Sequence, residues 1–455
     1  MKHFMQERKP ADSETKNIQH KKFSAFLNRL TLYCGGTSLL DGYILTVIGP
    51  ALMHLRPLMD LDVFWTGAIG SAALMGVLLG GPVFGYISDK VGRKLPFIVI
   101  PLAMAVLSIA SIFVTNAVQL FVIRFLAGVV VGSDYPSATA YLAEYSPPRW
   151  RGIMIGVLIL MLSGGMTLGE IVGYATYDSA YAWQILLGAP AVVAIPLALA
   201  RRRYPESPRW LINKGRAAEA RVIMKAVYGF SADTDDVEET TVKTSYRELL
   251  QPLYLKRIFF ASVFWATSVL PMFVMYIFGA VLLQDIQLGE GRGALLGNSL
   301  IGLIFIVGVV AGIAIIERFG RRPLLIWSFV GMALGLLLLA IVEEPPFWLV
   351  VLGFTIYALA SGPPNVLDWL YPNELFPTEV RAAGVGTVTA ISRFGPILGT
   401  FGLPYFLENF GIQATILTIV GILGFGLVVT VLLAPETRGL DLAESSGSIR
   451  DKRDT

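Results

Sequence analysis

Long apolar runs alternate with short polar segments along almost the whole chain. A helix needs about 20 apolar residues to cross a bilayer. Candidate spans lie near residues 27–52, 63–87, 95–115, 118–142, 152–174, 182–200, 257–284, 294–316, 323–342, 347–370, 382–407 and 411–434. The fifth and sixth spans meet at a tight loop, 177–181, where the pattern marks the division least clearly. The pattern predicts an all-α membrane protein with twelve transmembrane helices, six on each side of a polar central stretch.

Charged motifs at the ends of these spans occur twice. The first copies are Asp89-Lys90-Val91-Gly92-Arg93-Lys94, Glu144 with Arg151, and Pro205-Glu206-Ser207. The second copies follow in the same order in the other half of the chain, as Glu317-Arg318-Phe319-Gly320-Arg321-Arg322, Glu374 with Arg381, and Pro435-Glu436-Thr437. A repeat unit of half the chain determines the architecture. Because an even number of spans returns the chain to its starting side, we predict two parallel-repeat six-helix bundles, an arrangement found in many secondary transporters.

Basic residues are distributed unevenly between the two sides of the predicted bundles. They crowd the N-terminal segment and the loops after even-numbered spans, whereas the opposite loops contain only Arg56 and Arg292. Since loops rich in Lys and Arg stay in the cytoplasm, we expect both termini to be cytoplasmic. We expect a multi-pass protein of a bacterial inner (plasma) membrane. The polar first 26 residues lack the apolar core of a cleavable signal peptide.

The same pattern predicts the domain organisation. We expect a cytoplasmic tail, an N-terminal bundle, a cytoplasmic central loop, a C-terminal bundle and a second tail, at residues 1–26, 27–200, 201–256, 257–434 and 435–455. The first part of the central loop has mixed charges and predicts one or two short amphipathic helices. Its acidic, Ser/Thr-rich part, 232–244, predicts a flexible linker.

Composition excludes several classes of protein. Charged residues make up 15% of the chain, against about 25% in a soluble domain. The single cysteine, Cys34, excludes an internal disulfide, and the scattered histidines have no metal-ligand spacing. Basic residues lie in short loops and not along a helix face, so no nucleic-acid partner is expected. With no phosphate-binding glycine loop, we expect no cofactor, no enzymatic activity and, as the simplest state, a monomer in the lipid bilayer.

The repeated charges of the inner loops are candidates for a cytoplasmic gate. A loop that only anchors the chain needs Lys or Arg, but not an acid and a glycine at fixed places in both copies. One solvated ion pair contributes only ~0–1 kcal/mol, so these pairs would have to act as a network. The predicted gating residues are Asp89, Arg93, Glu144, Arg151, Glu317, Arg321, Glu374 and Arg381.

Taken in order, these motifs resemble those of the major facilitator superfamily, in its sugar-porter-like branch, over nearly the whole chain. The resemblance also covers Arg124, twenty residues before Glu144, and residues 205–211, 372–384 and 435–439. The chain looks most similar to enterobacterial inner-membrane metabolite transporters with poorly defined substrates. The resemblance implies a central cavity, alternating access, and inner Glu–Arg sets that latch the outward-facing state. Residues 265–273 are apolar and lack the Gln-Gln pair and the Asn of sugar porters, which argues against a sugar.

Ionisable residues within the predicted spans cost about 2.5–3.5 kcal/mol each, so a function is expected for them. They are Asp41, Arg124, Asp134, Glu170, Asp368 and Arg393. Counting from the span ends brings Asp41 and Arg124 to depths at which they could meet, which makes them the predicted proton-coupling pair. A static ion pair is the alternative. The Asp-Gly-Tyr context of Asp41 resembles that of aromatic-acid and related organic-acid symporters. The same count places Asp368 almost at the inner surface, as an interfacial charge.

Arg393 near mid-membrane allows two interpretations. It can bind an anionic substrate, since a guanidinium holds a carboxylate in two places, or it can pair with Glu170 or Asp134. The predicted substrate cavity contains Asp134, Glu170, Trp265, Ser268, Tyr276 and Arg393. The sequence predicts a secondary active transporter that works by alternating access, a proton symporter for an organic acid, an aromatic acid or a sugar-like metabolite. The alternatives are a passive uniporter or a proton-coupled exporter and, more remotely, a transporter-like sensor or channel.

Overall fold

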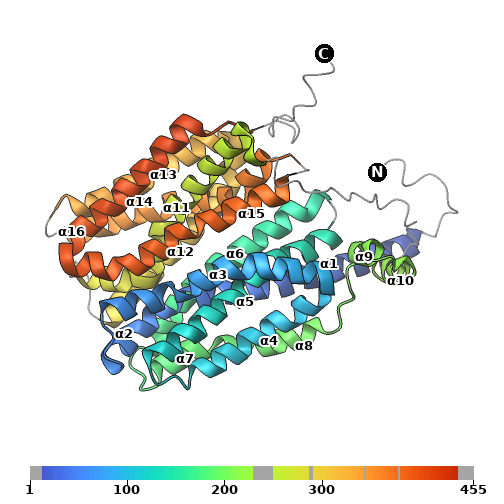
Figure 1. Ribbon diagram of the computed structural model, residues 1–455, viewed down its shortest axis with the longest axis horizontal. Coiled ribbons are helices and arrows are strands. Elements are labelled where there is room, and N and C mark those ends of the chain that lie inside the picture. Colours follow the sequence, from blue (N-terminus) through green and yellow to red (C-terminus); the bar gives the residue numbers. More distant parts are fainter. Residues whose placement is uncertain are drawn as a thin grey trace, which may run out of the picture.

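The computed structural model describes residues 13–146, 148–228, 249–285, 291–342, 345–377 and 380–438. Within these ranges the regular secondary structure is helical, as predicted. Figure 1 shows two groups of long helices side by side, α1–α8 in one and α11–α16 in the other. We call them the first and second halves.

The first half contains six crossings from one end of the molecule to the other. Its helices are α1 (Ser13–Thr46), α2 (Ile48–Leu58), α3 (Val63–Val91), α4 (Lys94–Ser111), α5 (Ala117–Tyr145), α6 (Pro148–Thr176), α7 (Ala182–Gly188) and α8 (Pro190–Arg201). The first crossing is divided at Val47 and the sixth at Ala189. The predicted division between the fifth and sixth spans is confirmed, because α6 ends before the tight loop and α7 begins after it.

The second half repeats this plan. Its helices are α11 (Pro252–Asp285), α12 (Arg292–Phe319), α13 (Arg321–Ala340), α14 (Phe347–Leu375), α15 (Arg381–Ser392) and α16 (Phe394–Leu433). Helix α16 contains non-helical backbone at Gly411, with φ 75° and ψ 175°, where one crossing ends and the next begins. Among the described residues, eleven helices are long and apolar enough to span a membrane, and the last of them is 51 residues long and contains two crossings. The twelve-helix prediction is thus confirmed.

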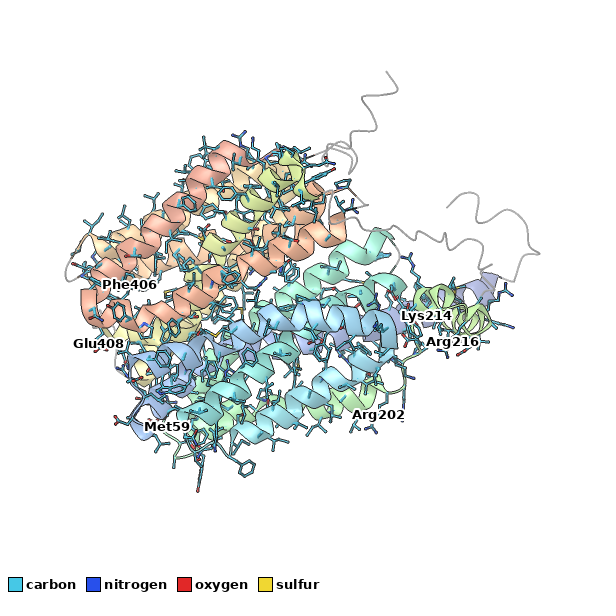
Figure 2. The ribbon with its side chains drawn as sticks, viewed as in Figure 1. Met59, Arg202, Lys214, Arg216, Phe406 and Glu408 are labelled. Carbon is cyan, nitrogen blue, oxygen red and sulfur yellow. The ribbon has the colours of Figure 1, made fainter. Side chains whose placement is uncertain are left out.

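Two short helices, α9 (Pro208–Asn213) and α10 (Ala217–Tyr228), follow the first half and pack on each other. They confirm the predicted short helices of the central loop, and α10 contacts α1. The predicted linker, 232–244, lies outside the described residues. Following the orientation that the charges predict, we call the end with α9 and α10 the inner end. Figure 2 shows Arg202, Lys214 and Arg216 at this end and Met59, Phe406 and Glu408 at the opposite, outer end.

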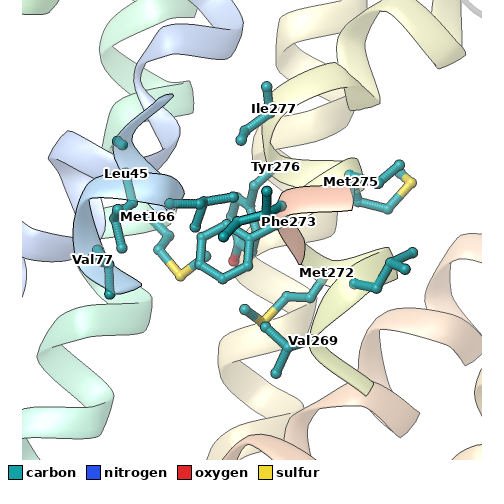
Figure 3. Close-up of a cluster of buried hydrophobic side chains, with 14 of the residues drawn as sticks. Leu45, Val77, Met166, Val269, Met272, Phe273, Met275, Tyr276 and Ile277 are labelled. Atoms are coloured by element: carbon teal, nitrogen blue, oxygen red, sulfur yellow. The ribbon is translucent and has the colours of Figure 1, made fainter. Parts of the chain in front are cut away.

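The halves pack directly against each other in their outer parts. Helix α3 contacts α16, α6 contacts α12, and α2 contacts α11. A Cβ atom on Gly49 would lie 2.4 Å from the Ile277 carbonyl oxygen, and one on Gly67 would lie 2.2 Å from that of Phe401. These glycines therefore allow the backbones of the two halves to approach closely. Figure 3 shows the apolar cluster between the halves, in which Met166 faces Phe273.

Candidate functional site

A glycine turn begins α4 at the inner end of the first half. Gly92 has a φ of 104°, a conformation that glycine adopts without steric cost. The backbone N–H groups of Arg93 and Lys94 then donate to the Glu206 carboxylate, at 2.9 and 3.1 Å. A carboxylate here satisfies the free N–H groups of the helix and complements its dipole. The Arg93 Nε donates to Glu144 at 3.4 Å.

The second half builds the same network at its own inner end. Gly320 has a φ of 88°, and the backbone N–H groups of Arg321 and Arg322 donate to the Glu436 carboxylate, at 3.0 and 3.1 Å. The Arg321 guanidinium donates to Glu374 at 2.8 Å and to Glu317 at 3.1 Å. The same types of contact, an arginine with a glutamate and two backbone N–H groups with a second glutamate, therefore occur in both halves. The repeat seen in the sequence is also a repeat of side-chain contacts.

Some of the predicted gating residues form ion pairs in these networks, and others do not. Arg93 contacts Glu144, and Arg321 contacts both Glu317 and Glu374. The Arg381 Nε donates to the Phe376 carbonyl at 3.0 Å. The side chains of Asp89 and Arg151 lie outside the described part of the structure.

Sequence reasoning missed the carboxylates that complete both networks. Glu206 and Glu436 were treated as parts of a repeated motif and not as partners of the loops. The Tyr141 hydroxyl donates to the carbonyl of Pro205, and the Tyr371 hydroxyl donates to that of Pro435. The Pro-Glu pair that occurs in both halves was the sequence signal that could have identified Glu206 and Glu436.

Arg124 does not pair with Asp41, so the predicted contact is wrong. Its guanidinium donates to the carbonyl oxygens of Ile44 at 2.6 Å and Leu45 at 3.4 Å, close to the break between α1 and α2. Both residues are one helical turn further along α1 than Asp41. Arg124 therefore interacts with the backbone of the broken helix.

Asp41 is instead a neighbour of Asp134, which projects from α5. The two side chains are 0% and 1% exposed. They lie near enough for their charges to interact, and the Thr37 hydroxyl lies beside Asp134. Asp134 also lines a cavity of about 30 Å³, together with Ser38, Trp369 and other residues. It has room for a water molecule.

Arg201 is the cation beside this carboxyl pair, and sequence reasoning misplaced it. It was counted among the basic residues of the inner loop, but its side chain is 0% exposed. Its charge acts on both Asp41 and Asp134. Arg201 is therefore inside the bundle, at the end of α8, whereas the next two residues, Arg202 and Arg203, are exposed. We call Asp41, Asp134 and Arg201 the acidic cluster.

A second group of charges lies in the second half, at the break between α15 and α16. Arg393 occupies this break, is 7% exposed and lies over the ring of Trp265, 5.1 Å from its centroid. Its charged neighbour is Asp368, and not Glu170 or Asp134. Asp368 was predicted to be interfacial, which is wrong: it is 1% exposed and accepts a hydrogen bond from Ser268 at 3.4 Å. We call Arg393, Trp265, Asp368 and Ser268 the Arg393 cluster.

The Arg393 guanidinium has no hydrogen-bond acceptor among the described residues. Its Nε is buried without a hydrogen bond, and no ion pair joins it to a described residue. A buried cation without an acceptor is costly. The guanidinium therefore has N–H groups available for an acceptor beyond the described residues.

Tyr135 connects the two clusters across the boundary between the halves. It follows Asp134 on α5, and its ring contacts that of Trp369 on α14, with 5.6 Å between centroids. The charges of Asp41, Asp134 and Arg393 all act on its hydroxyl. Neither Tyr135 nor Trp369 was among the predicted site residues, because a tyrosine or tryptophan in a span is common and carries no distinguishing signal.

Glu170 and Tyr276 lie apart from both clusters, in the outer part of the boundary. Glu170 is 0% exposed on α6, with Asn298 of α12 beside it. The hydroxyl of Tyr276 lies 3.2 Å from the Thr167 hydroxyl of the other half. These contacts join the two halves, so Glu170 and Tyr276 are not part of the Arg393 cluster.

Among the described residues, no group of three or more His, Cys, Asp or Glu side chains could hold a metal ion.

Comparisons with known proteins match this fold and its motifs. The model of the family "Sugar (and other) transporter" matches residues 7–447. The metabolite transport protein YaaU of Escherichia coli (strain K12) is 41% identical, over 96% of this chain and 99% of its own length. The inner membrane metabolite transport protein YgcS of the same strain is 35% identical, over 91% of this chain and 92% of its own length.

Solved structures show the same arrangement of helices. A partially occluded inward-open structure of the xylose transporter XylE from E. coli gives a TM-score of 0.78 at 21% identity, over 92% of this chain and 100% of that chain. At this identity the similarity shows the fold alone. The family match and the two relatives show more: the chain belongs to the sugar (and other) transporter family of the major facilitator superfamily.

Proposed function

We propose that this transporter is a proton symporter for a small anionic metabolite. One observation carries the proposal: two buried groups of charge flank the boundary between the halves, a carboxyl pair in the first half and, in the second, a guanidinium without a hydrogen-bond acceptor among the described residues. They suit the two cargoes of a symporter, a proton and an anion. The solved relative XylE is described as a proton:xylose symporter, which supports the proton coupling.

The proton site in this proposal is the Asp41–Asp134 pair, in place of Asp41 with Arg124. Two buried carboxylates side by side repel each other, and burial disfavours their charge. The pair therefore binds a proton when it is sealed from water. In this proposal, water held in the small cavity that Asp134 lines exchanges the proton with the pair.

The substrate site in this proposal is the Arg393 cluster. A guanidinium suits a carboxylate because it offers two parallel hydrogen bonds. The ring of Trp265 faces it, and the rings of Trp369 and Tyr135 extend this aromatic surface by successive ring contacts. A planar organic acid fits these groups better than a sugar, which would need many more polar partners.

The inner-end networks are proposed as the elements that hold each half rigid while the halves move. The ion pairs of Arg93 and Arg321 each lie within one half, so a network can move as a unit with its own bundle. We further propose that the inner end faces the cytoplasm, with both termini on that side, and that the protein is a monomer of the bacterial inner membrane.

A ligand screen tests the substrate assignment. Thermal unfolding of the purified protein is measured with benzoate, lactate, alanine and glucose as probes. We expect benzoate or lactate to raise the unfolding temperature, since a ligand at a hundred times its Kd stabilises by about 2.7 kcal/mol. Arg393→Gln should abolish this effect, and Arg393→Lys should weaken it.

Arg292→Gln is the matched control, because Arg292 is exposed at the outer end and pairs with Asp178 at 3.1 Å. Stabilisation that survives Arg393→Gln would refute the anion site. Accumulation of the ligand in proteoliposomes then tests coupling: collapse on adding an uncoupler is expected of a symporter, whereas unchanged equilibration would favour a uniporter.

A further inference from the structure

Arg201 is fixed between three helices in the interior of the first half. From the end of α8, its Nη1 donates to the Phe97 carbonyl of α4 at 2.9 Å. Its Nη2 donates to the Thr37 hydroxyl of α1 at 2.8 Å and to the carbonyl of Tyr33. The guanidinium lies 3.9 Å from the centroid of the Phe97 ring. These contacts leave the group little freedom to move.

The same contacts place Arg201 beside the carboxyl pair. Thr37 and Asp41 are four residues apart on α1 and so share one face of the helix. That face meets α5, since the Cys34 thiol donates to the Ala138 carbonyl at 3.8 Å. Ala138 in turn lies one turn from Asp134. The carboxyl pair therefore lies near the buried guanidinium, and Asp134 also lines the small cavity.

No other cation among the described residues acts on both carboxyls. The titratable groups that face Arg201 are Cys34 and Asp41 on α1, and Asp134 and Tyr141 on α5. Tyr135, on the far side of Asp134, also feels the pair. The Arg201 Nε has no hydrogen-bond partner among the described residues, so the group is not neutralised by its structural contacts.

Counting charges then gives the preferred state of the sealed site. With both carboxyls ionised the cluster has a net charge of −1, and with both protonated it has a net charge of +1. With one proton shared between them it is neutral, and a buried cluster favours neutrality because an unpaired charge is strongly penalised.

We infer that Arg201 is the fixed counter-charge of the Asp41–Asp134 pair and holds this pair at one shared proton whenever the site is sealed. The inference rests on the proposed proton site and assigns it a proton count. Arg201 acts here as a positioning residue, through the carboxyls and not on the substrate. A purely structural role would need only its hydrogen bonds, whereas this role needs its charge.

Infrared titration of the purified full-length protein tests the charge directly and needs no substrate. The C=O band of protonated carboxyls is assigned by difference, with Asp41→Asn and Asp134→Asn. Arg201→Gln keeps hydrogen-bond donors but removes the charge, so the site should take up a second proton. The pH at which the pair releases its proton should rise by about 1–3 units, the usual effect of removing a neighbouring opposite charge. Arg201→Lys, which keeps the charge, should leave it near the wild-type value.

A second variant tests the inference without altering Arg201, in case its substitution prevents folding. In Asp41→Asn, one carboxyl faces one guanidinium, so Asp134 should be ionised and show no protonated C=O band at neutral pH. A protonated Asp134 in this variant would overturn the inference, as would an Arg201→Gln titration identical to wild type. If wild type shows no protonated band from either aspartate at any pH, the proposed proton site itself is refuted.

Discussion

The two halves of this transporter agree at their inner ends and differ in their interiors. Arg93, Glu144 and Glu206 of the first half have the counterparts Arg321, Glu374 and Glu436, with the same partners. The acidic cluster has no such counterpart. When the repeats are aligned on Glu144 and Glu374, the positions equivalent to Asp41, Asp134 and Arg201 hold Pro271, Pro364 and Val431.

The difference is reciprocal. In the same alignment, the first-half positions equivalent to Arg393 and Asp368 hold Ser163 and Ala138. Both changes concern groups that are buried at or near the boundary between the halves. Where the halves do the same mechanical task, the networks are duplicated. Where each holds its own charges, the duplicated positions have become apolar or small, because an unneeded buried charge is costly.

Replacing one aspartate of each half by asparagine should give the largest difference between the halves. Asp134→Asn should abolish proton-driven accumulation of the ligand identified by the screen, because the shared proton site is lost, while ligand exchange at equal pH continues. Asp368→Asn should keep accumulation and instead raise the affinity for the anionic ligand, by about tenfold, because it removes the acid that competes for Arg393. Both activities are measured in proteoliposomes. If the two variants lose the same activity, the division of labour between the halves is wrong.

Disturbing the outer contact should have the next largest effect. Gly49→Ala would place a Cβ 2.4 Å from the Ile277 carbonyl oxygen, and such overpacking costs about 1–3 kcal/mol. The outer parts should separate more often, which spin labels at Leu58 and Glu408 would detect as longer distances.

Gly156→Ala is the matched control, since a Cβ there meets nothing within 4 Å. Equal distance distributions for both alanine variants would show that the Gly49 contact does not hold the outer end closed.

The two inner-end carboxylates should have equal effects, and these should appear in stability and not in the separation of the halves. Glu206→Gln and Glu436→Gln each remove a charged acceptor from several backbone N–H groups, at a cost of about 1.5–3 kcal/mol. The unfolding temperature should fall by similar amounts in both. A large difference between the two variants would mean that the resemblance of the networks is not matched by their energetics.

The comparison also shows what the sequence could reveal. Apolar length predicts the crossings, and the repeat predicts the paired networks, because both depend on position along the chain. Pairing between helices depends on rotation about each helix axis as well. An error of a single helical turn separated Asp41 from the carbonyls that Arg124 binds. Uncertain helix ends likewise placed Arg201 and Asp368 at the inner surface, although both are buried.

The smallest expected effect concerns the link between the halves. Tyr135→Phe removes the hydroxyl on which both clusters act, and one such interaction contributes about 0.5–1.5 kcal/mol. Ligand affinity should therefore depend less steeply on pH, by about threefold to tenfold across the titration of the proton site. Tyr357→Phe is the control, because its hydroxyl is buried in the second half without a hydrogen-bond partner among the described residues. If ligand affinity in both variants keeps the wild-type pH dependence, proton binding and substrate binding are coupled only by the movement of the halves. The two interiors would then be separate sites without a direct electrostatic link.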